Sequence, residues 1–339
     1  MIIDSHVHLV DHGWIREDFF YHLARVVAAN MGKETGESPD ARFLVEAMKD
    51  NLMDSTGEKL INTMDEAGVD RSCVFPVDYG PTAGNPKVPI EDQNRAVSEA
   101  VQKFPDRLWG FFAVDPRREK AVEMFSRGIE KWGLHGLKLH PAGGFYPYQE
   151  VAYPLYEKCV EYGVPVIIHT GSQPPPMKSR FCRPVYVDDV AADFPDLPII
   201  MAHCGHHWWE EALMVASVKP NCYVDISGWQ RGLQEDPRSF YVKLRHILDA
   251  LGPWRVFWGS DGPYLNAIYS LPQWLNAMKN PASYLSSAEV IEPESESKSE
   301  SESESEPKSD TEVTSGDAEI TFTSQEIEII TGKAFAQLM

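Results

Sequence analysis

Two histidines, His6 and His8, stand one residue apart at the end of the apolar run that opens the chain. If this run is a β-strand, side chains at positions i and i+2 leave the same face, so both imidazoles can converge on one point. Imidazole is a common ligand of zinc and of its neighbours among the first-row metals. A lone pair of this kind is more often a hydrogen-bonded part of the core, so a metal site needs support from elsewhere in the chain.

The same pattern recurs along the chain, where further apolar runs end in residues that can bind a metal or exchange a proton. These residues are Lys138 and His140, His169, His203, and Asp261. In a parallel α/β protein the carboxyl ends of the strands share one rim, and ligands bind there. The recurrence therefore predicts that the reactive side chains gather at one end of the fold.

A single divalent metal ion is the chemistry that these residue types favour. The predicted ligands are His6, His8, His169 and Asp261. Three imidazole nitrogens and one carboxylate oxygen suit Zn²⁺, our first choice, or Mn²⁺ or another first-row ion, and they leave a coordination position for water. Water bound there would have a pKa of about 7 and would supply hydroxide at neutral pH. His203 is free to act as a general acid or base, and we assign catalysis to Asp261 and His203.

Eight apolar strands that alternate with helical segments are expected to position these residues. The strands are the run ending at His8 and residues 71–77, 108–114, 136–140, 165–169, 198–202, 222–226 and 255–259, and seven of them follow a helical segment. This number of buried strands is typical of a closed (β/α)₈ barrel, the TIM barrel. An open doubly wound sheet is the alternative. The barrel is favoured because the reactive ends belong to strands 1, 4, 5, 6 and 8, which could hardly meet at one site in an open sheet.

Two segments depart from this alternation. Residues 11–57 form an insertion after the first strand, which we interpret either as a lid or binding loop over the rim or as a helical hairpin of local importance. Residues 285–319 are an acidic run of Ser and Glu without apolar periodicity, and we predict that this segment is disordered. Residues 1–284 and 320–339 are then one barrel domain, with a final helix that is capped near Thr323 and ends at about Leu338.

Composition limits the classes of partner. The formal net charge is −20, and residues 289–319 contribute 12 acidic residues against two lysines, a net −10. An acidic chain without a basic stripe is not expected to bind nucleic acid, and no apolar run approaches the roughly 20 residues that span a bilayer. The five cysteines include no C-x-x-C pair, which argues against a disulfide framework and a zinc cluster. We expect a cytoplasmic enzyme with a small-molecule substrate. The sequence is compatible with a homodimer.

Four short motifs resemble the amidohydrolase superfamily. They are Asp4-Ser-His6-Val-His8, His169-Thr-Gly, Ala-His203-Cys-Gly and Gly-Ser-Asp261. The likeness is greatest to the amidohydrolase-related branch, which includes aminocarboxymuconate-semialdehyde and resorcylate decarboxylases and several lactone or C–C hydrolases, and it covers about residues 1–280 and the final helix. The resemblance implies a (β/α)₈ barrel, a metal held by the four predicted ligands, His203 beside the catalytic water or substrate, and Asp261 as the acceptor of the water proton. One departure disfavours decarboxylation, because Gly262-Pro263-Tyr264 follows Asp261 where the decarboxylases commonly have an aromatic residue and proline.

The residues expected to bind the substrate lie on the predicted rim. They are Lys138, His140, Phe145, Tyr146, Arg180, Arg183, Trp208, Trp229, Arg231 and Tyr264. The arginines would clamp a carboxylate and the aromatic rings would form apolar walls. Lys138 would anchor a substrate carboxylate, neutralise the site or, as in some amidohydrolases, be carboxylated and bridge a second metal; we predict one metal because no second ligand set is as complete. His206 and His207 are assigned to the start of the helix after strand 6.

Three functions are compatible with this pattern. We favour hydrolysis of a small ester, lactone or amide through metal-bound hydroxide, with Asp261 or His203 handling the proton. The alternative is non-oxidative decarboxylation of a small aromatic or unsaturated carboxylic acid. The third is a non-catalytic, metal-stabilised binding protein.

Overall fold

A ring of parallel strands forms the centre of the protein in a computed structural model that describes residues 1–288 and 320–339. The strands, in chain order, are β1 (Ile3–His8), β2 (Arg71–Phe75), β3 (Leu108–Gly110), β4 (Phe112–Ala113), β5 (Leu137–Leu139), β6 (Val166–His169), β7 (Ile199–Ala202), β8 (Cys222–Asp225) and β9 (Val256–Phe257). Sequential strands pair in parallel from β1 to β3 and from β4 to β9. Each strand is buried because the sheet is covered on both faces.

The expected strand over residues 108–114 is broken at Phe111. The Phe111 amide donates to the carbonyl of Val74 on β2 at 2.9 Å, whereas the Phe112 amide donates to the carbonyl of Gly136 beside β5 at 2.8 Å. β3 and β4 are therefore one strand position that changes partner, and the ring has eight positions, as predicted.

The ring closes between β1 and the segment after β9. The amide of Ser5 donates to the carbonyl of Trp258 at 3.1 Å, and the amide of His8 donates to the carbonyl of Gly262 at 2.7 Å. Closure confirms the barrel over the open sheet. It brings His8 next to Asp261, although 253 positions separate them in the chain.

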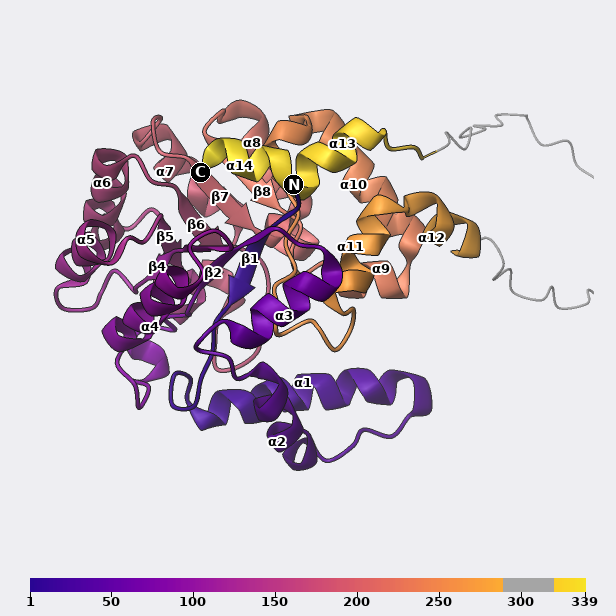
Figure 1. Ribbon diagram of the computed structural model, residues 1–339, viewed down its shortest axis with the longest axis horizontal. Coiled ribbons are helices and arrows are strands. Elements are labelled where there is room, and N and C mark those ends of the chain that lie inside the picture. The colour runs from indigo at the N-terminus through magenta and orange to yellow at the C-terminus, as the bar shows by residue number, and fades with distance from the viewer. Residues whose placement is uncertain (289–319) are drawn as a thin grey trace, which may run out of the picture.

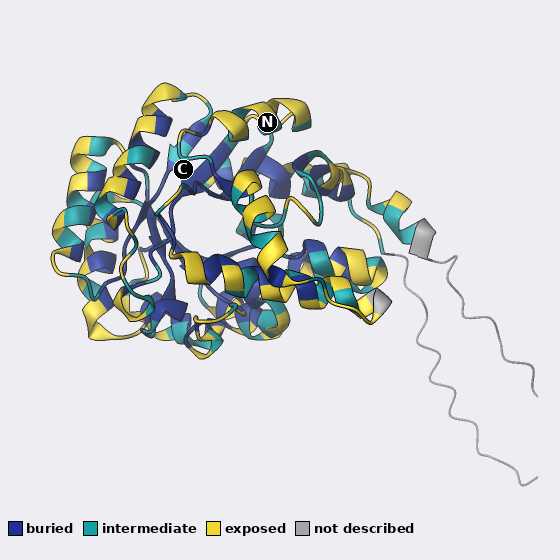
Figure 2. Ribbon diagram, turned by 90° about the horizontal axis from the view of Figure 1, so that it is seen from below, coloured by how far each residue is buried: buried dark blue, intermediate teal, exposed yellow. Residues whose placement is uncertain are grey.

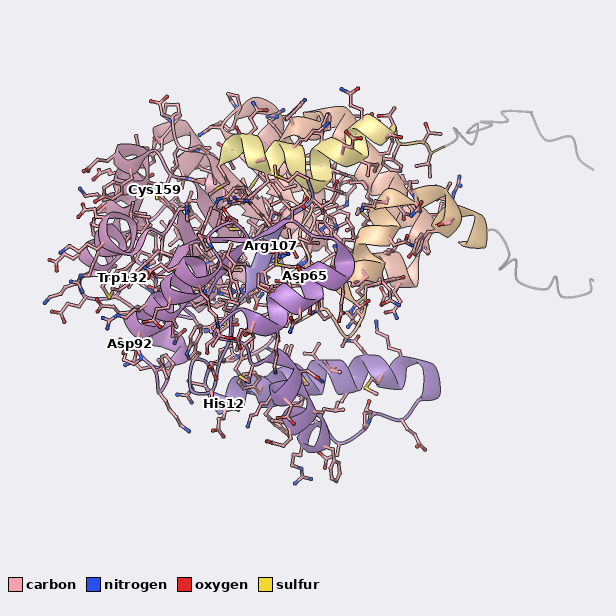
Figure 3. The ribbon with its side chains drawn as sticks, viewed as in Figure 1. His12, Asp65, Asp92, Arg107, Trp132 and Cys159 are labelled. Atoms are coloured by element: carbon pink, nitrogen blue, oxygen red, sulfur yellow. The ribbon has the colours of Figure 1, made fainter. Side chains whose placement is uncertain are left out.

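Helices surround the ring (Figure 2). They are α3 (Glu58–Ala67), α4 (Ile90–Lys103), α5 (Ala121–Trp132), α6 (Tyr153–Tyr162), α7 (Asp188–Asp193), α8 (Trp209–Val218), α9 (Gln230–Glu235), α10 (Pro237–Leu251), α11 (Leu271–Lys279) and α12 (Pro281–Ala288). Helix α3 is followed by Gly68, whose φ of 71° is the left-handed conformation typical of a C-cap glycine. Arg107 closes the following turn, with contacts of 2.8 Å to the Asp65 carboxylate and to the Asp70 carbonyl (Figure 3).

The C-terminal helical segment covers the amino-terminal end of the barrel, beside the start of β1 (Figure 1). It comprises α13 (Ser324–Glu328), a π-helical turn (Ile329–Lys333) and α14 (Ala334–Leu338). Thr323 and Glu326 form the capping box that the sequence predicted. Phe335 packs on Phe257 inside the barrel end, with ring centroids 5.2 Å apart. This end is therefore filled by apolar side chains.

The insertion after β1 lies at the opposite end of the barrel as a helical hairpin, α1 (Glu17–Thr35) and α2 (Ala41–Leu52) (Figure 1). The Asp54 amide donates to the carbonyl of Val10 at 2.7 Å, so the insertion returns to the place where it left β1. Phe19 and Phe20 anchor α1 in the core. The hairpin thus covers the carboxyl ends of the strands.

The predicted start of the acidic segment, residue 285, was wrong. Helix α12 extends to Ala288, so residues 285–288, which we expected to be disordered, are helical. The reason is packing, since Tyr284 and Leu285 lie against the core of the barrel. The rest of the segment, 289–319, lies outside the described residues, and the two-part domain division remains a prediction. None of the described helices is both long and apolar enough to cross a membrane.

Candidate active site

The two histidines of β1 meet Asp261 at the carboxyl end of the barrel. The distance from His8 Nε2 to Asp261 Oδ1 is 3.1 Å, and that from His6 Nε2 to the same oxygen is 3.7 Å. Asp261 has a φ of 54°, and its amide donates to the carbonyl of His6 at 2.9 Å. The left-handed backbone turns this carboxylate back over β1, which is strain of the kind found at functional sites.

The histidines of β6 and β7 complete the cluster. His203 Nε2 lies 3.1 Å from His169 Nδ1. One ligand atom each from His6, His203 and Asp261 lies within 4.8 Å of the other two. The structure thus brings together all four predicted ligands and His203. The tightest trio includes His203, while His8 contacts Asp261 and His169 contacts His203.

Asp225, at the end of β8, orients two of these imidazoles. Its Oδ2 accepts a hydrogen bond from His6 Nδ1 at 3.0 Å, and its Oδ1 accepts one from the amide of His203 at 2.9 Å. His203 Nδ1 lies 3.0 Å from the carbonyl of Ser227. Both imidazoles therefore carry their N–H on Nδ1 and present a lone pair on Nε2, which is how metal-bound histidines are usually held. Asp225 was not among the predicted residues, although it ends an apolar run as they do.

The donor set fits a divalent metal ion. Burial lowers the pKa of His6, His8, His169 and His203 well below the usual range, and the nearby charge of Lys138 adds to the effect. Neutral imidazoles are the form that binds metals. Burial also raises the pKa of Asp261 to about 7, against the lowering effect of Lys138. A cation between these groups would remove the cost of burying that carboxylate, which supports a cation site here.

Lys138 lies beneath the cluster and is almost fully buried. Its Nζ is 3.2 Å from His6 Nε2 and 4.7 Å from the centre of the Phe75 ring. Burial lowers the pKa of Lys138 to about 8, opposed by Asp225 and Asp261. The amine therefore contributes positive charge close to neutral pH, next to the candidate ligands.

An open cavity of about 180 Å³, which we call the active-site cavity, leads to the cluster. Its walls include His8, His140, His169, His203 and Asp261, together with Phe19, Leu23, Val77, Tyr79, Ser172, Gln173, Pro174, His206, Gly228, Tyr264 and Leu265. Phe19 and Leu23 come from α1, so the hairpin after β1 forms part of the substrate cavity. The cavity is large enough for a molecule of about one aromatic ring.

The predicted substrate residues divide into two groups. His140 and Tyr264 line the active-site cavity, and Trp229 and Arg231 line a neighbouring one. The structure does not bring the others to either cavity: Phe145, Tyr146, Arg180, Arg183 and Trp208. Arg183 pairs instead with Glu211 of α8 at 2.7 Å, because the loop after β6 carries it to the outer surface. Arg180 lies over the ring of Phe181 at 4.8 Å.

His206 is a second residue whose place the sequence did not reveal. Its ring stacks on His203, with centroids 4.8 Å apart and an angle of 17°. Gly171 and Gly228, whose φ values are 101° and 83°, flank the ring, and a Cβ on either would come within 2.5 Å of one of its nitrogens. His206 has itself a φ of 51° rather than a helical one. The sequence offers one signal, a glycine shortly after each of two strands, Gly171 and Gly228. Its meaning becomes clear only when the position of the His206 ring is known.

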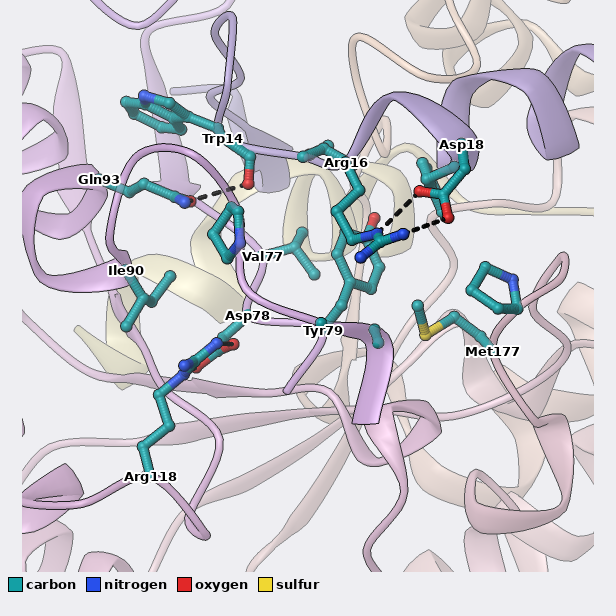
Figure 4. Close-up of a pocket in the computed structure, with 16 residues that line it drawn as sticks. Trp14, Arg16, Asp18, Val77, Asp78, Tyr79, Ile90, Gln93, Arg118 and Met177 are labelled. Carbon is teal, nitrogen blue, oxygen red and sulfur yellow. Dashed lines mark hydrogen bonds and ion pairs between the residues drawn. The ribbon is translucent and has the colours of Figure 1, made fainter. Parts of the chain in front are cut away.

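Hydrogen bonds around a smaller pocket hold the loop that follows β2 in place (Figure 4). Arg118 donates two hydrogen bonds to Asp78, at 2.5 and 2.7 Å, and Gln93 donates to the carbonyl of Trp14 at 3.1 Å. The side chain next in the chain, Tyr79, packs edge-on against His140 of the active-site cavity, with centroids 5.0 Å apart. The Asp78–Arg118 ion pair thereby positions one wall of that cavity.

Comparison with known proteins agrees with this arrangement. The family model described as "Amidohydrolase" matches residues 3–292. A curated relative, 2-keto-4-carboxy-3-hexenedioate hydratase of Sphingobium sp., is 25% identical over 193 residues, which is 48% of this chain and 57% of the hydratase. The match thus spans little more than half the length of that relative.

Two solved structures show the same fold. The 5-carboxyvanillate decarboxylase of Novosphingobium aromaticivorans, solved with manganese and 4-hydroxy-3-methoxy-5-nitrobenzoic acid, has a TM-score of 0.58 and 18% identity, with 84% of this chain and 92% of that one covered. The 2,6-dihydroxybenzoate decarboxylase of Rhizobium has a TM-score of 0.59 and 16% identity, with 99% and 98% covered. At these identities the likeness establishes the fold.

Proposed function

Since the chain belongs to the amidohydrolase family, whose relatives are enzymes, we propose that it is a metal-dependent lyase that removes the carboxyl group of a small aromatic or unsaturated carboxylic acid. The ligands that we propose for the metal are His6, His8, His169 and Asp261. His203 Nε2 faces the same point and would contact substrate oxygens there. We propose Mn²⁺ as the metal instead of Zn²⁺, which we expected from the sequence, because proteins of this fold were solved with manganese.

The observation that carries the proposal is the convergence of His6, His203 and Asp261, with ligand atoms within 4.8 Å, at one end of a cavity of about 180 Å³. A divalent metal supplies a Lewis acid that can hold a carboxylate and a neighbouring oxygen. The cavity walls would orient the rest of the substrate, with the rings of Phe19, Tyr79 and Tyr264 against a planar body.

Loss of CO₂ breaks the bond between the carboxyl carbon and the adjacent unsaturated carbon, and the electron pair stays on that carbon. A proton must therefore be delivered to it. We assign this proton transfer to Asp261, which lies 3.1 Å from His8 Nε2 and lines the active-site cavity. Phe19 and Leu23 of α1 would limit the access of water to this step.

The names of the relatives support a lyase ahead of a hydrolase. Two act on benzoic acids as decarboxylases, and the curated hydratase is named for an unsaturated carboxylic acid. Hydrolysis of an ester, lactone or amide, which the sequence favoured, is the second candidate. Its support is the departure at Gly262-Pro263-Tyr264 and the exposure of Asp261 to the cavity, where it could accept a proton from water.

The test is a direct contest between the two reactions. The purified protein is stripped with a chelator, reloaded with Mn²⁺ or Zn²⁺, and given hydroxybenzoates and unsaturated acids labelled with ¹³C in the carboxyl group. We expect labelled CO₂ from at least one acid, and loss of this release in Asp261→Asn and His203→Asn. Acid release from an ester and lactone panel without labelled CO₂ would establish the hydrolase instead. Neither product with either metal would refute both.

A further inference from the structure

A second cavity, which we call the distal pocket, opens beside the active-site cavity. It has a volume of about 280 Å³ and shares four lining residues with the active-site cavity, namely Ser172, His206, Gly228 and Leu265. The two cavities therefore meet, with the imidazole of His206 at the junction. A ligand longer than one ring can extend from the metal-binding cluster into the distal pocket.

Two cations line the distal pocket. Arg231 of α9 and Lys243 of α10 are half-buried there, and neither has an ion pair or hydrogen bond with another residue in the parts of the chain that the structure describes. The acidic residue of the lining, Glu235, pairs at 3.1 Å with Lys33 of α1. The distal pocket thus offers unbalanced positive charge in a chain whose formal net charge is −20. An anionic group is the ligand chemistry that this charge selects.

Arg231 is held in fixed relation to the metal-binding cluster by the two residues before it. Trp229 donates its indole N–H to the carbonyl of His203 at 2.7 Å, and the side-chain amide of Gln230 donates to the carbonyl of Ser260. Ser260 immediately precedes Asp261. The start of α9 is therefore fixed to the two strand ends that carry His203 and Asp261. The backbone of Arg231 is thus held in place before a ligand binds.

Three apolar rings form further walls of the distal pocket. They come from Trp209, Trp229 and Phe240. From these walls and the two cations we propose that the distal pocket binds a second carboxylate of the substrate. The substrate would then be a dicarboxylic acid with an apolar or unsaturated body between its ends. This inference rests on the proposed function, which places the first carboxylate at the metal. Arg231 is suited to hold the second carboxylate by two parallel hydrogen bonds, and Lys243 adds a point charge.

The experiment measures binding and needs no turnover. Saturated α,ω-dicarboxylates from succinate to suberate, and the monocarboxylates of equal carbon number from butanoate to octanoate, are titrated by calorimetry into the Mn²⁺-loaded protein. We expect one chain length at which the dicarboxylate binds at least about tenfold more tightly than its monocarboxylate partner, a modest effect for hydrogen bonds to charged groups. Arg231→Gln and Lys243→Gln should each reduce this preference, and the double variant should abolish it.

Arg127→Gln is the matched control, because this arginine lies on α5 and pairs with Glu91 outside both cavities. It should keep the full preference. The inference is overturned if the wild-type protein prefers no dicarboxylate at any length, or if the folded double variant keeps the preference. Should the double variant fail to fold, the two single variants decide by the same criterion. Failure of the proposed function looks different, since it would remove product formation and leave the dicarboxylate preference intact.

Discussion

The Asp225 carboxylate accepts a hydrogen bond of 3.0 Å from Nδ1 of His6, a residue 219 positions away in the chain. This bond fixes which imidazole nitrogen of His6 faces the cluster. Groups that orient a ligand in this way commonly change metal affinity by 10- to 100-fold when they are removed.

We therefore predict that Asp225→Asn weakens Mn²⁺ binding by about 10- to 100-fold, because the amide can present its N–H to Nδ1 and turn the lone pair away from the metal. Metal affinity is measured by competition with a chelating dye. Asp196→Asn, on the exposed surface, is the control. Unchanged affinity in Asp225→Asn would show that the hydrogen bond does not serve a metal ligand.

The two glycines beside His206 give a prediction about coupling. Gly228→Ala places a Cβ 2.5 Å from His206 Nε2 and also forces alanine to a φ of 83°. We expect a loss of about 3 kcal/mol in the free energy of unfolding, of which backbone strain accounts for about 1 to 2. In a His206→Ala background the clash with the His206 ring disappears and only the contact of 3.0 Å with His203 Nδ1 and the strain remain, so the same substitution should cost less. Urea denaturation of the four proteins of this cycle measures the difference. Additive losses would contradict the close contact between Gly228 and the ring.

The Asp78–Arg118 ion pair is expected to stabilise the loop that carries Tyr79. Asp78 is 2% exposed and Arg118 is 16% exposed, so removing one partner leaves a charge with little access to water. We predict that Asp78→Asn lowers the free energy of unfolding by about 3 kcal/mol. The surface substitution Asp106→Asn, at a side chain that is 96% exposed, should change it by less than about 1 kcal/mol. Equal effects in the two variants would reject a structural role for the buried pair.

The cap over the amino-terminal end of the barrel gives a prediction about pH. The Arg245 guanidinium lowers the pKa of Glu326, and the hydrogen bonds from Thr323 act in the same direction. A carboxyl group with a lowered pKa stabilises the fold above its unfolded pKa of about 4.3, and this stabilisation is lost as the pH falls through the folded pKa. Glu326→Gln should therefore lower the melting temperature at pH 7 and have a smaller effect at pH 3.

Glu157→Gln, on the exposed face of α6, is the control for this measurement. It should leave the melting temperature nearly unchanged at both pH values. A melting-temperature difference between wild type and Glu326→Gln that stays constant from pH 7 to pH 3 would disprove the ion-pair explanation.

The local sequence determined the strands, most of the helices and the candidate ligands. Alternation of apolar strands with helices depends on short-range periodicity, so it can be read without knowing the packing. The same holds for the reactive residues at strand ends, because a parallel barrel places every such end on one rim. His6, His8, His169, His203 and Asp261 were found in this way, and the structure brings them into one cluster of side chains in contact.

Tertiary structure alone decided the details that depend on residues far apart in the chain. Phe111 breaks its strand because the ring changes partner there, which depends on the neighbouring strands and not on the local sequence. Arg183 lies on the outer surface, where it pairs with Glu211 of α8, whereas Asp225 and His206 reach the site through contacts across the ring. Which side chains finally face one another is fixed by closure of the barrel, and closure is a property of all eight strand positions together.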